Sequence, residues 1–311
     1  MSIFMKDKPK IVVILGPTAS GKTGLAIKLA RMFDGEIVSV DSRQVYRGMD
    51  IGTGKDLADY SQDGVKVFYH LIDVTEPNEV FDLAQYKQQA ETAISDILNR
   101  NKLPIVVGGS GLYLEALINN YQLAPVKADA KLRDSLEAMS LDDIFAMIEK
   151  NNPSFSAKIN HSDRHNKRRL IRYLEVFAQA GSVTSKGEAK YDSLIIGLDW
   201  PRPELNKRIH QRLVQRLDEQ DMVEEVNNLN RQGLSWQRLE SFGLEYKFIA
   251  WYLQEKIDYD EMVLRLERAI YQFAKRQMTW FKRWEKNGAK INWLDNPVSA
   301  PELVEKFLNI I

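Results

Sequence analysis

The stretch IVVILGPTASGKT, residues 11–23, joins five apolar residues to the pattern G-x-x-x-x-G-K-[ST]. Glycines in this pattern let backbone N–H groups curl around phosphate oxygens, and the following helix points its positive end at them. Lys22 adds a positive charge, and the hydroxyl of Thr23 can hold Mg²⁺. A turn that binds no phosphate is the simpler alternative. The apolar run before the loop and the helical pattern after it favour a buried strand that leads into a phosphate-binding loop.

The composition is that of an ordinary globular protein. The 311 residues are 44% hydrophobic and 28% charged, enough for one large domain with an insertion or for two domains. The absence of cysteine excludes disulfides, thiol catalysis and cysteine-based metal sites. No segment is long enough for a signal peptide or a membrane span, so we expect a cytoplasmic protein. Because 43 basic and 43 acidic residues cancel, a nucleic-acid partner has to be inferred from local clusters.

Strand and helix patterns alternate along the N-terminal part of the chain. Apolar runs at 36–40, 70–74 and 104–110 have the length and composition of strands, and residues 83–99 carry apolar side chains at helical spacing. This alternation predicts an α/β fold, with a parallel sheet of the P-loop NTPase type and helices on both faces. Asp41 directly follows the second strand, at the carboxyl edge where open α/β sheets carry their chemistry.

The pattern changes after Leu117. From 129 to 180 only amphipathic helical stretches occur, and the strand signal returns at 193–199. We therefore expect a helical insertion at 121–189, with residues 1–120 and 190–311 forming the α/β core and its helical C-terminal part. The elements expected in that C-terminal part are helices at 205–231, 245–255 and 259 to about 284, and an edge strand at 291–294.

A basic stretch lies inside the expected insertion. Between Lys158 and Arg172, several cationic side chains face a single acidic residue, Asp163. In a helix Arg164, Arg168 and Arg172 share one face. Since almost no local acid is available to pair with these cations, we expect contacts with phosphate; a solvated polar face is the alternative.

A second basic stretch is AKRQMTWFKRW, residues 274–284. Apolar residues at helical spacing from Tyr259 to Trp284 predict a buried stripe interrupted only by Gln277, which needs a buried partner or a bound ligand. Another face of the same helix carries cations, including Lys275 and Lys282. We expect that face to contact a polyanion, with a solvated surface as the alternative.

Five segments together resemble the signature blocks of the tRNA dimethylallyltransferases, also called tRNA isopentenyltransferases. They are GPTASGKT at 16–23, VDSRQVYRGMDIGTGK at 40–55, VVGGSGLYLEAL at 106–117, RRLIRYLEVF at 168–177 and AKRQMTWFKRW at 274–284. The second block is the most specific, because phosphate loops are shared by many families. The resemblance implies transfer of a dimethylallyl group from dimethylallyl diphosphate to N6 of adenosine 37, beside the anticodon, in tRNAs that read codons beginning with U.

That reaction accounts for the chemistry of the motifs. The phosphate loop would hold a departing diphosphate instead of ATP, with N–H donors, Lys22 and Mg²⁺ stabilising its growing charge. The adenine amine is a poor nucleophile, so a base must take its proton, and Asp41 is the candidate. Ser110, where the family usually has Thr, would donate to the bridging oxygen of the leaving group. A stacked anticodon-loop base must be flipped out, which suits an RNA-binding insertion.

The resemblance also assigns roles to individual residues, in a protein expected to be a monomer with Mg²⁺ as its cofactor. Diphosphate contacts are implied for Gly16, Thr18, Ala19, Ser20, Gly21, Lys22 and Thr23, with Thr23 as the protein ligand of the metal. Contacts with tRNA are implied for Asp41, Ser42, Arg43, Gln44, Arg133, Arg168, Arg169, Arg172, Lys275, Arg276, Gln277 and Lys282.

Three segments depart from the family's pattern. Residues 270–277 read IYQFAKRQ where the family commonly has T-R-Q-Y-A-K-R-Q, so an arginine expected near the diphosphate is missing, and Arg268 is a candidate to replace it. Residues 241–247 read SFGLEYK where the family usually has I-G-Y-[KR], and Ser110 replaces Thr. These changes bear on how many cations contact the leaving group.

Several alternatives stay open at this point. Ser42 and Ser110 could simply cap helices, and Asp41 could be a metal ligand of the Walker-B kind. A P-loop kinase or a free-adenylate prenyltransferase is the second functional hypothesis, and it predicts turnover of a small molecule without RNA. A non-catalytic RNA-binding module with a vestigial phosphate site is the third.

Overall fold

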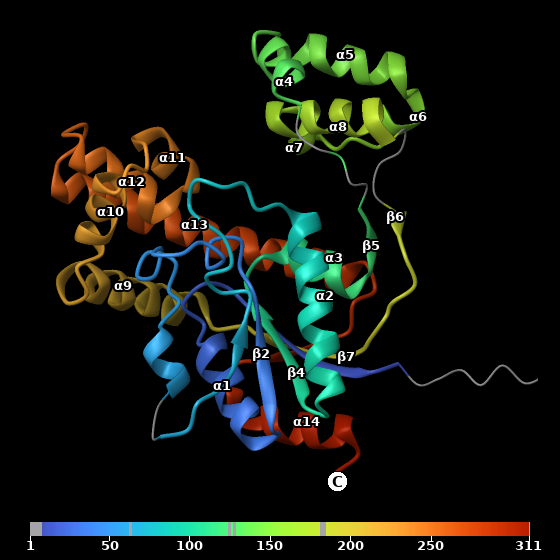
Figure 1. The fold of residues 1–311 in the computed structure, drawn as a ribbon, viewed down its shortest axis with the longest axis vertical. Helices are drawn as coiled ribbons and strands as arrows, with labels where there is room; N and C mark the ends of the chain where they lie inside the picture. Colours follow the sequence, from blue (N-terminus) through green and yellow to red (C-terminus); the bar gives the residue numbers. More distant parts are fainter. Residues whose placement is uncertain (1–7, 62–63, 124–125, 127–128, 181–184, 311) are drawn as a thin grey trace, which may run out of the picture. The chain divides into compact units, whose positions relative to one another are not determined.

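The computed structural model describes residues 8–61, 64–123, 126, 129–180 and 185–310. The chain divides into two compact units, one of Met1–Asn119 with Ala189–Ile311 and one of Asn120–Glu188. The first unit contains a six-stranded sheet, and the second is built of helices and a two-stranded ladder (Figure 1). No helix of the described residues combines the length and the apolarity needed to cross a bilayer.

The six-stranded sheet is parallel and has the strand order β3-β2-β4-β1-β7-β8. The strands in this order are Tyr69–His70, Gly35–Val40, Leu103–Gly108, Lys10–Leu15, Asp192–Leu198 and Ile291–Leu294. In the central strand β1, Leu15 pairs with Gly108 on one side and Gly197 on the other, and Ile11 to Leu15 are fully buried. A strand covered on both faces is a continuous apolar run, which is why residues 11–15 could be predicted as a strand.

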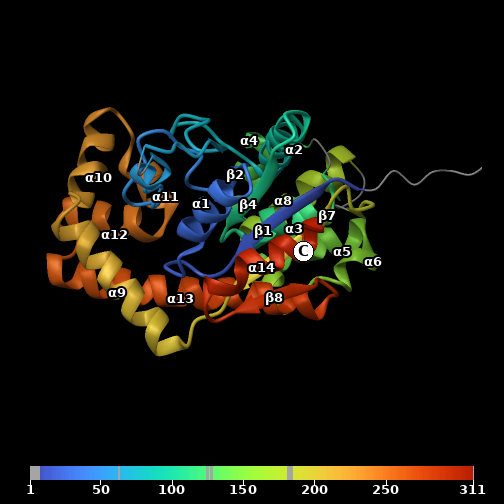
Figure 2. The ribbon, with the colours of Figure 1, turned by 90° about the horizontal axis from the view of Figure 1, so that it is seen from below.

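Helices cover both faces of the sheet, so the predicted α/β architecture is confirmed (Figures 1 and 2). On one face Leu25 and Leu29 of α1 and Val304 of α14 share a core with the sheet. The larger core on the other face includes Ile94 of α2 and Phe281 of α13. The covering helices on the two faces are α1 (Lys22–Met32) with α14 (Ala300–Leu308), and α2 (Leu83–Asn99) with α3 (Gly111–Ile118) and α13 (Tyr259–Lys286).

The C-terminal part of the first unit is largely helical, as predicted, but it is divided differently. The single helix expected at 205–231 is two helices, because Asp221 adopts a left-handed conformation with φ 55° between them. The short helix α11 and the C-terminal helix α14 were not predicted. The helices of this part besides α13 and α14 are α9 (Arg202–Asp218), α10 (Met222–Arg231), α11 (Trp236–Phe242) and α12 (Leu244–Leu253).

Two further predictions need correction. The strand expected at 70–74 is only Tyr69–His70, because Leu71 and Asp73 have positive φ angles of 64° and 57° that a strand cannot contain. The buried stripe of α13 runs through Leu266, Ile270, Phe281 and Trp284 as expected. It begins at Met262, however, and Tyr259 is 39% exposed.

The second unit has a core of its own. Its helices are α4 (Ala130–Glu137), α5 (Leu141–Asn151), α6 (Pro153–Ser156), α7 (His161–Arg164) and α8 (Lys167–Ala180). Leu136, Ile144, Ile148, Leu170 and Leu174 are buried together between them. At the chain's entry to and exit from this unit, β5 (Tyr121–Gln122) pairs with β6 (Ser185–Lys186) in an antiparallel ladder that was not predicted.

Candidate active site

The phosphate-binding loop begins directly at the end of β1 and ends at α1. Gly16 adopts φ +154°, and a Cβ there would lie 2.9 Å from the carbonyl oxygen of Leu198 on the neighbouring strand β7, so only glycine fits. Gly21 is the N-cap of α1 in a left-handed conformation, with φ 87°. The backbone therefore turns at these two positions as an anion cradle at a helix N-terminus requires.

Lys22 is the first residue of α1, and its Nζ donates to the carbonyl oxygen of Pro17 at 2.6 Å. Burial and the positive charge of Arg212 lower the pKa of Lys22 to about 7, and the negative charge of Asp41 partly opposes this shift. A lysine held within the loop with a depressed pKa is an ammonium that lacks a strong anionic partner, and a bound phosphate would supply one.

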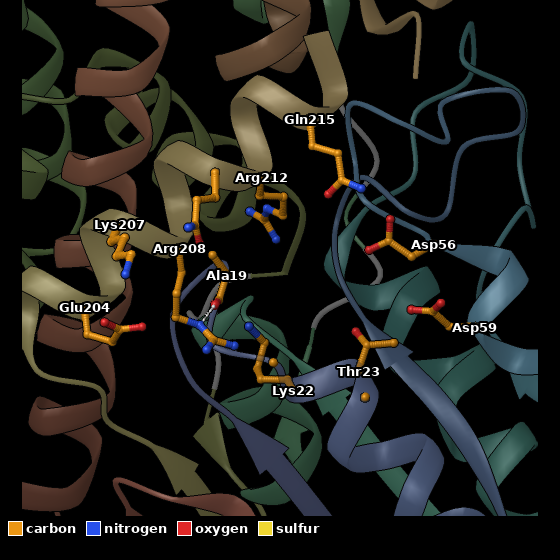
Figure 3. A pocket seen from close by; sticks show the side chains of 13 residues that line it. Ala19, Lys22, Thr23, Asp56, Asp59, Glu204, Lys207, Arg208, Arg212 and Gln215 are labelled. Atoms are coloured by element: carbon orange, nitrogen blue, oxygen red, sulfur yellow. Dashed lines mark hydrogen bonds between the residues drawn. The ribbon is translucent and has the colours of Figure 1, made fainter. Parts of the chain in front are cut away.

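Beside the loop lies a cleft of about 570 Å³ (Figure 3). On one side Arg208 and Arg212 project from α9: Arg208 Nε donates to the carbonyl oxygen of Ala19 at 3.0 Å, and Arg212 Nη2 donates to Thr18 Oγ1. On the other side are Thr23 and carboxylates from the segment after β2. The side chains around the cleft include Lys22, Thr23, Asp56, Asp59, Glu204, Lys207, Arg208, Arg212 and Gln215.

Sequence reasoning missed the arginines of α9. Arg208, Arg212 and Arg216 are spaced by four residues, which places them on one face of a helix, and this periodicity was available in the sequence. The proposed substitute for the missing arginine, Arg268, is exposed on α13. Tyr271, at the position where the family commonly has arginine, donates its hydroxyl to Glu267 at 2.7 Å. The arginines at the cleft therefore come from α9.

Gln277 of α13 is buried, with 7% of its surface exposed, and it joins two loops. Its Oε1 accepts from the backbone N–H of Thr18 at 2.8 Å, and its Nε2 donates to the carbonyl oxygen of Gly109 at 3.0 Å. The prediction that this side chain needs a buried partner is confirmed. Its contact with RNA stays a prediction, since each end of its amide already makes one hydrogen bond inside the protein.

Asp41 stands at the end of β2 in a tight turn. Its Oδ1 accepts from the backbone N–H groups of Arg43 at 2.8 Å and Gln44 at 3.4 Å. Burial raises the pKa of the carboxyl, while these hydrogen bonds and the positive charges of Arg43 and Lys22 oppose the rise. Asp41 is not among the residues that surround the cleft, but its charge and that of Lys22 affect each other's pKa.

The hydroxyl of Ser110 lies beside this turn. Ser110 occupies the N-cap position of α3, yet its side chain makes no capping hydrogen bond. Its Oγ instead accepts from the backbone N–H of Ser42 at 3.3 Å. The alternative in which Ser110 is only a helix cap is therefore wrong, and the end of β4 is joined to the Asp41 turn.

Gln44 and Arg43 are held by other parts of the first unit. Gln44 Oε1 accepts from Ser39 Oγ at 2.8 Å, and its Nε2 donates to the carbonyl oxygen of Gly54 at 2.9 Å, so both ends of its amide bond within the protein and its contact with RNA stays a prediction. The guanidinium of Arg43 lies 5.3 Å from the ring centroid of Phe242. Phe242 belongs to the segment 241–247 that departs from the family's pattern, and this contact gives the segment a place next to the predicted site.

The basic residues of the second unit have more acidic partners than the sequence indicated. Glu175, whose side chain is fully buried, accepts from Arg133 at 2.7 Å and 3.0 Å and from Arg172 at 3.1 Å. Arg169 pairs with Asp163. The expectation that these cations lack local acid is therefore wrong, because Glu175 follows just after the stretch 158–172, lies one turn from Arg172 on α8 and also meets Arg133 of α4. Arg168 is exposed.

The cations of α13 also divide into two kinds. Lys282 pairs with Asp199 at 3.2 Å and lies 3.9 Å from the ring centroid of Trp293. Lys275 and Arg276 are exposed, about two turns before it. Lys282 is therefore engaged within the protein, whereas Lys275 and Arg276 are accessible to a polyanion.

Comparison with known proteins identifies the family. The model of a family described as IPP transferase matches residues 44–284. The chain is 43% identical over 285 residues to tRNA dimethylallyltransferase 1 of Geotalea uraniireducens, covering 92% of each chain. It is similar to the crystal structure of the full-length tRNA isopentenylpyrophosphate transferase of Bacillus halodurans, with a TM-score of 0.68, 35% identity, and 97% of this chain and 96% of that chain covered.

A eukaryotic dimethylallyltransferase acting on tRNA shares the fold, with a TM-score of 0.79 at 24% identity over 97% of this chain and 80% of that chain. The phosphate loop, the Asp41 turn and the helical unit between β4 and β7 thus stand in a chain similar to these enzymes over nearly all its length. The chain belongs to the IPP transferase family, the family of the tRNA dimethylallyltransferases.

Proposed function

We propose that this protein transfers a dimethylallyl group from dimethylallyl diphosphate to N6 of adenosine 37 in tRNAs that read codons beginning with U, giving N6-isopentenyladenosine and diphosphate. The observation that carries the proposal is that the phosphate loop and the Asp41 turn lie at the ends of strands separated only by β4, close enough for Lys22 and Asp41 to shift each other's pKa. An anion site and a carboxylate base so placed suit a transfer in which diphosphate leaves as an amine loses its proton.

The donor's diphosphate fits the cleft beside the phosphate loop. Lys22, Arg208 and Arg212 border it, and N–H groups of the loop and the N-terminus of α1 add partial positive charge. As the allylic C–O bond breaks, negative charge grows on the diphosphate. These preorganised donors therefore stabilise the transition state more than the ground state.

Magnesium fits the same cleft. Thr23, whose hydroxyl is an oxygen donor, borders it, and the described residues contain no group of three or more His, Asp or Glu side chains placed to enclose a metal. Mg²⁺ at such a site is held by one or two protein oxygens together with phosphate oxygens and water. Thr23 would be its protein ligand, and the ion would supply further charge stabilisation to the leaving group.

Asp41 is the base of the proposed transfer. The turn holds its Oδ1, and no described residue donates to its Oδ2, so this second oxygen is free to accept the proton of the adenine amine. Ser110 Oγ accepts from Ser42, which leaves its own hydrogen free to be donated to the bridging oxygen of the leaving diphosphate. The two side chains would then act on opposite sides of the allylic carbon: Asp41 on the amine that bonds to it, and Ser110 on the diphosphate oxygen that leaves it.

The anticodon loop would be bound by cations outside the donor cleft. Arg168 of α8, Lys275 and Arg276 are exposed, and exposed guanidinium and ammonium groups are suited to phosphate contacts. Arg133, Arg169 and Arg172, which pair with acids, retain exposed side-chain fractions of 46%, 49% and 38% and can share their outer N–H groups with RNA. Residues 121–189 are thus proposed as the tRNA-binding insertion.

Incubation with labelled dimethylallyl diphosphate, Mg²⁺ and a tRNA with adenosines at positions 36 and 37 tests the proposal. We expect label in the tRNA, and mass spectrometry of its nucleosides should identify N6-isopentenyladenosine. No incorporation into any tRNA would refute the proposal. Turnover of free adenylate without RNA would favour the small-molecule alternative instead.

A further inference from the structure

Arg216 is the third of the arginines spaced by four on α9, and the only one of the three that does not reach the phosphate loop in the described structure. Its residue is 4% exposed, so the guanidinium is taken out of water almost completely. Isolating a guanidinium from water is costly unless it gains strong partners. A guanidinium this deeply buried therefore depends on the groups around it.

The described partner of Arg216 is a carboxylate at the wall of the cleft. Arg216 Nη2 lies 3.5 Å from Asp56 Oδ1 and 3.4 Å from Asp56 Oδ2. Charge-assisted N–H···O bonds are usually about 2.7–2.9 Å long, so this contact is a loose one. Asp56 itself is 41% exposed and borders the cleft. The buried charge thus stands directly behind a partly exposed acid that faces the proposed donor site.

Gly54 leaves the space that the guanidinium occupies. A Cβ on Gly54 would lie 2.3 Å from Arg216 Nη2 and 3.1 Å from its Cζ. Gly54 also has φ +67°, a conformation that other residues adopt with strain. A side chain at position 54 would therefore collide with the guanidinium of Arg216 where it now lies.

The loop around Gly54 cannot easily shift to relieve crowding. Glu225 of α10 accepts from the backbone N–H groups of Asp50 at 2.8 Å, Ile51 at 2.6 Å and Gly52 at 3.0 Å. The carbonyl oxygen of Gly54 accepts from Gln44 in the Asp41 turn at 2.9 Å. Arg216 consequently contacts a rigid loop that is joined to the proposed base on one side and borders the cleft on the other.

The charges around the cleft give this contact a function. Four cationic side chains border the cleft, but so do three acidic ones: Lys22, Lys207, Arg208 and Arg212 against Asp56, Asp59 and Glu204. A nearly balanced wall attracts a diphosphate only weakly. Arg216 offsets the charge of Asp56 from behind, which leaves the cations of the cleft in excess of its acids. Burial, together with the charge of Arg216, also lowers the pKa of Arg212 to about 10, so the two guanidiniums act on the same space.

We propose that Arg216 is a positioning residue for donor binding: its buried guanidinium lies beside Asp56 at the cleft wall and offsets the charge of that carboxylate, so that the cleft retains a net attraction for diphosphate. This inference rests on the proposed function, because it takes the cleft to be the site of the donor's diphosphate. It also gives the chain a source for positive charge at the cleft that position 271 does not provide.

The test measures the binding of inorganic pyrophosphate with Mg²⁺ by calorimetry, which needs no tRNA and no turnover. In Arg216→Met we expect the Kd for pyrophosphate to rise roughly 10- to 50-fold, the size of the attraction between two unit charges about 7–12 Å apart at an effective dielectric constant of about 20. In steady-state assays KM for dimethylallyl diphosphate should rise while kcat changes little. Arg216→Lys, which keeps the charge, should recover part of the affinity.

Two further variants separate positioning from a structural role. Arg231→Met removes an exposed arginine of α10 that pairs with Glu224, and it should leave pyrophosphate affinity unchanged. Gly54→Ala should displace the guanidinium and weaken pyrophosphate binding about as much as Arg216→Met does. In the Arg216→Met background, where the crowding is gone, Gly54→Ala should add less than twofold.

The inference is overturned if folded Arg216→Met binds pyrophosphate within twofold of the parent, or if the effects of Gly54→Ala and Arg216→Met on affinity multiply. Melting curves establish that each variant is folded. A parent protein that binds pyrophosphate in an Arg216-dependent way but never prenylates tRNA would refute the proposed function and leave this inference standing.

Discussion

At the scale of single residues, Asp41 has a structural task on one oxygen and a proposed chemical task on the other. Its Oδ1 accepts the backbone N–H of Arg43 at 2.8 Å and so holds the turn, while under the proposed function Oδ2 would take the proton of the substrate amine. An asparagine keeps an acceptor oxygen for the turn and loses only the ability to take a proton.

The variant Asp41→Asn should therefore reduce the single-turnover rate of prenyl transfer by about 10²- to 10⁴-fold, the usual contribution of a general base. We expect the affinity for tRNA and the melting temperature to stay close to those of the parent. Rapid-quench measurement with saturating enzyme checks the rate. A loss of less than tenfold would show that another group takes the proton.

Lys22 gives the donor site a pH dependence. Its pKa of about 7 in the free protein means that the ammonium loses its proton as the pH rises through neutrality. A bound anion favours the protonated form, so pyrophosphate affinity should fall as the pH rises above about 7. Lys22→Arg stays charged throughout, and the ratio of the two Kd values between pH 6 and 9 isolates this effect from the ligand's own titration. A constant ratio would contradict the prediction.

At the scale of secondary-structure elements, α13 supports the site from behind. One glutamine of this 28-residue helix bonds to the phosphate loop through Thr18 and to the loop after β4 through Gly109. The phosphate loop and the loop after β4 are thereby tied to α13, which lies far from both of them in the sequence. An apolar residue at 277 would continue the stripe but leave a buried N–H and a buried carbonyl without partners.

We expect Gln277→Leu to lower the free energy of unfolding by about 1–3 kcal/mol, the usual cost of burying unsatisfied polar groups. Because Thr18 belongs to the phosphate loop, pyrophosphate affinity should fall as well. Chemical denaturation and calorimetry measure the two effects. Met278→Leu, on the same helix one residue further and half-buried, is the control that should change neither. Unchanged stability in Gln277→Leu would refute the proposed support.

At the scale of the whole molecule, the two compact units have separate cores and separate proposed tasks. Every residue at the donor cleft belongs to the first unit, whereas α8 and its arginines belong to the second. Within the second unit, Glu175 binds Arg133 and Arg172, so these two arginines also stabilise the fold. Arg168 is the better probe of RNA binding, because it is exposed and the structure gives it no such bond.

Arg168→Ala should weaken tRNA binding and reduce the slope of log K against log salt by about one, as expected for the loss of one phosphate contact. Pyrophosphate affinity should be unchanged, since the donor cleft belongs to the other unit. Filter binding between 50 and 300 mM salt measures the affinity for tRNA and its salt slope, and calorimetry measures the affinity for pyrophosphate. An unchanged salt slope would remove Arg168 from the RNA-binding surface.

The sequence by itself determined the phosphate loop, the α/β core and the position of Asp41. Each depends on neighbours along the chain: a fully buried parallel strand is a continuous apolar run, and a phosphate loop is a local pattern of glycines. The family resemblance lay in the same contiguous blocks. Gln277 was marked as unusual because helical periodicity alone placed a polar residue in an apolar stripe.

Only the tertiary structure decided which charges act together. Arg208 and Arg212 reach the phosphate loop across about 190 residues, Glu175 meets Arg133 from another helix, and Arg216 fits only because residue 54 is glycine. Sequence spacing places such side chains on a face but gives no partner, because ion pairs and close packing depend on distances that the folded chain sets. That is why the arginines of α9 were missed, while Arg268, which is exposed and is not among the residues that border the cleft, was named as the candidate.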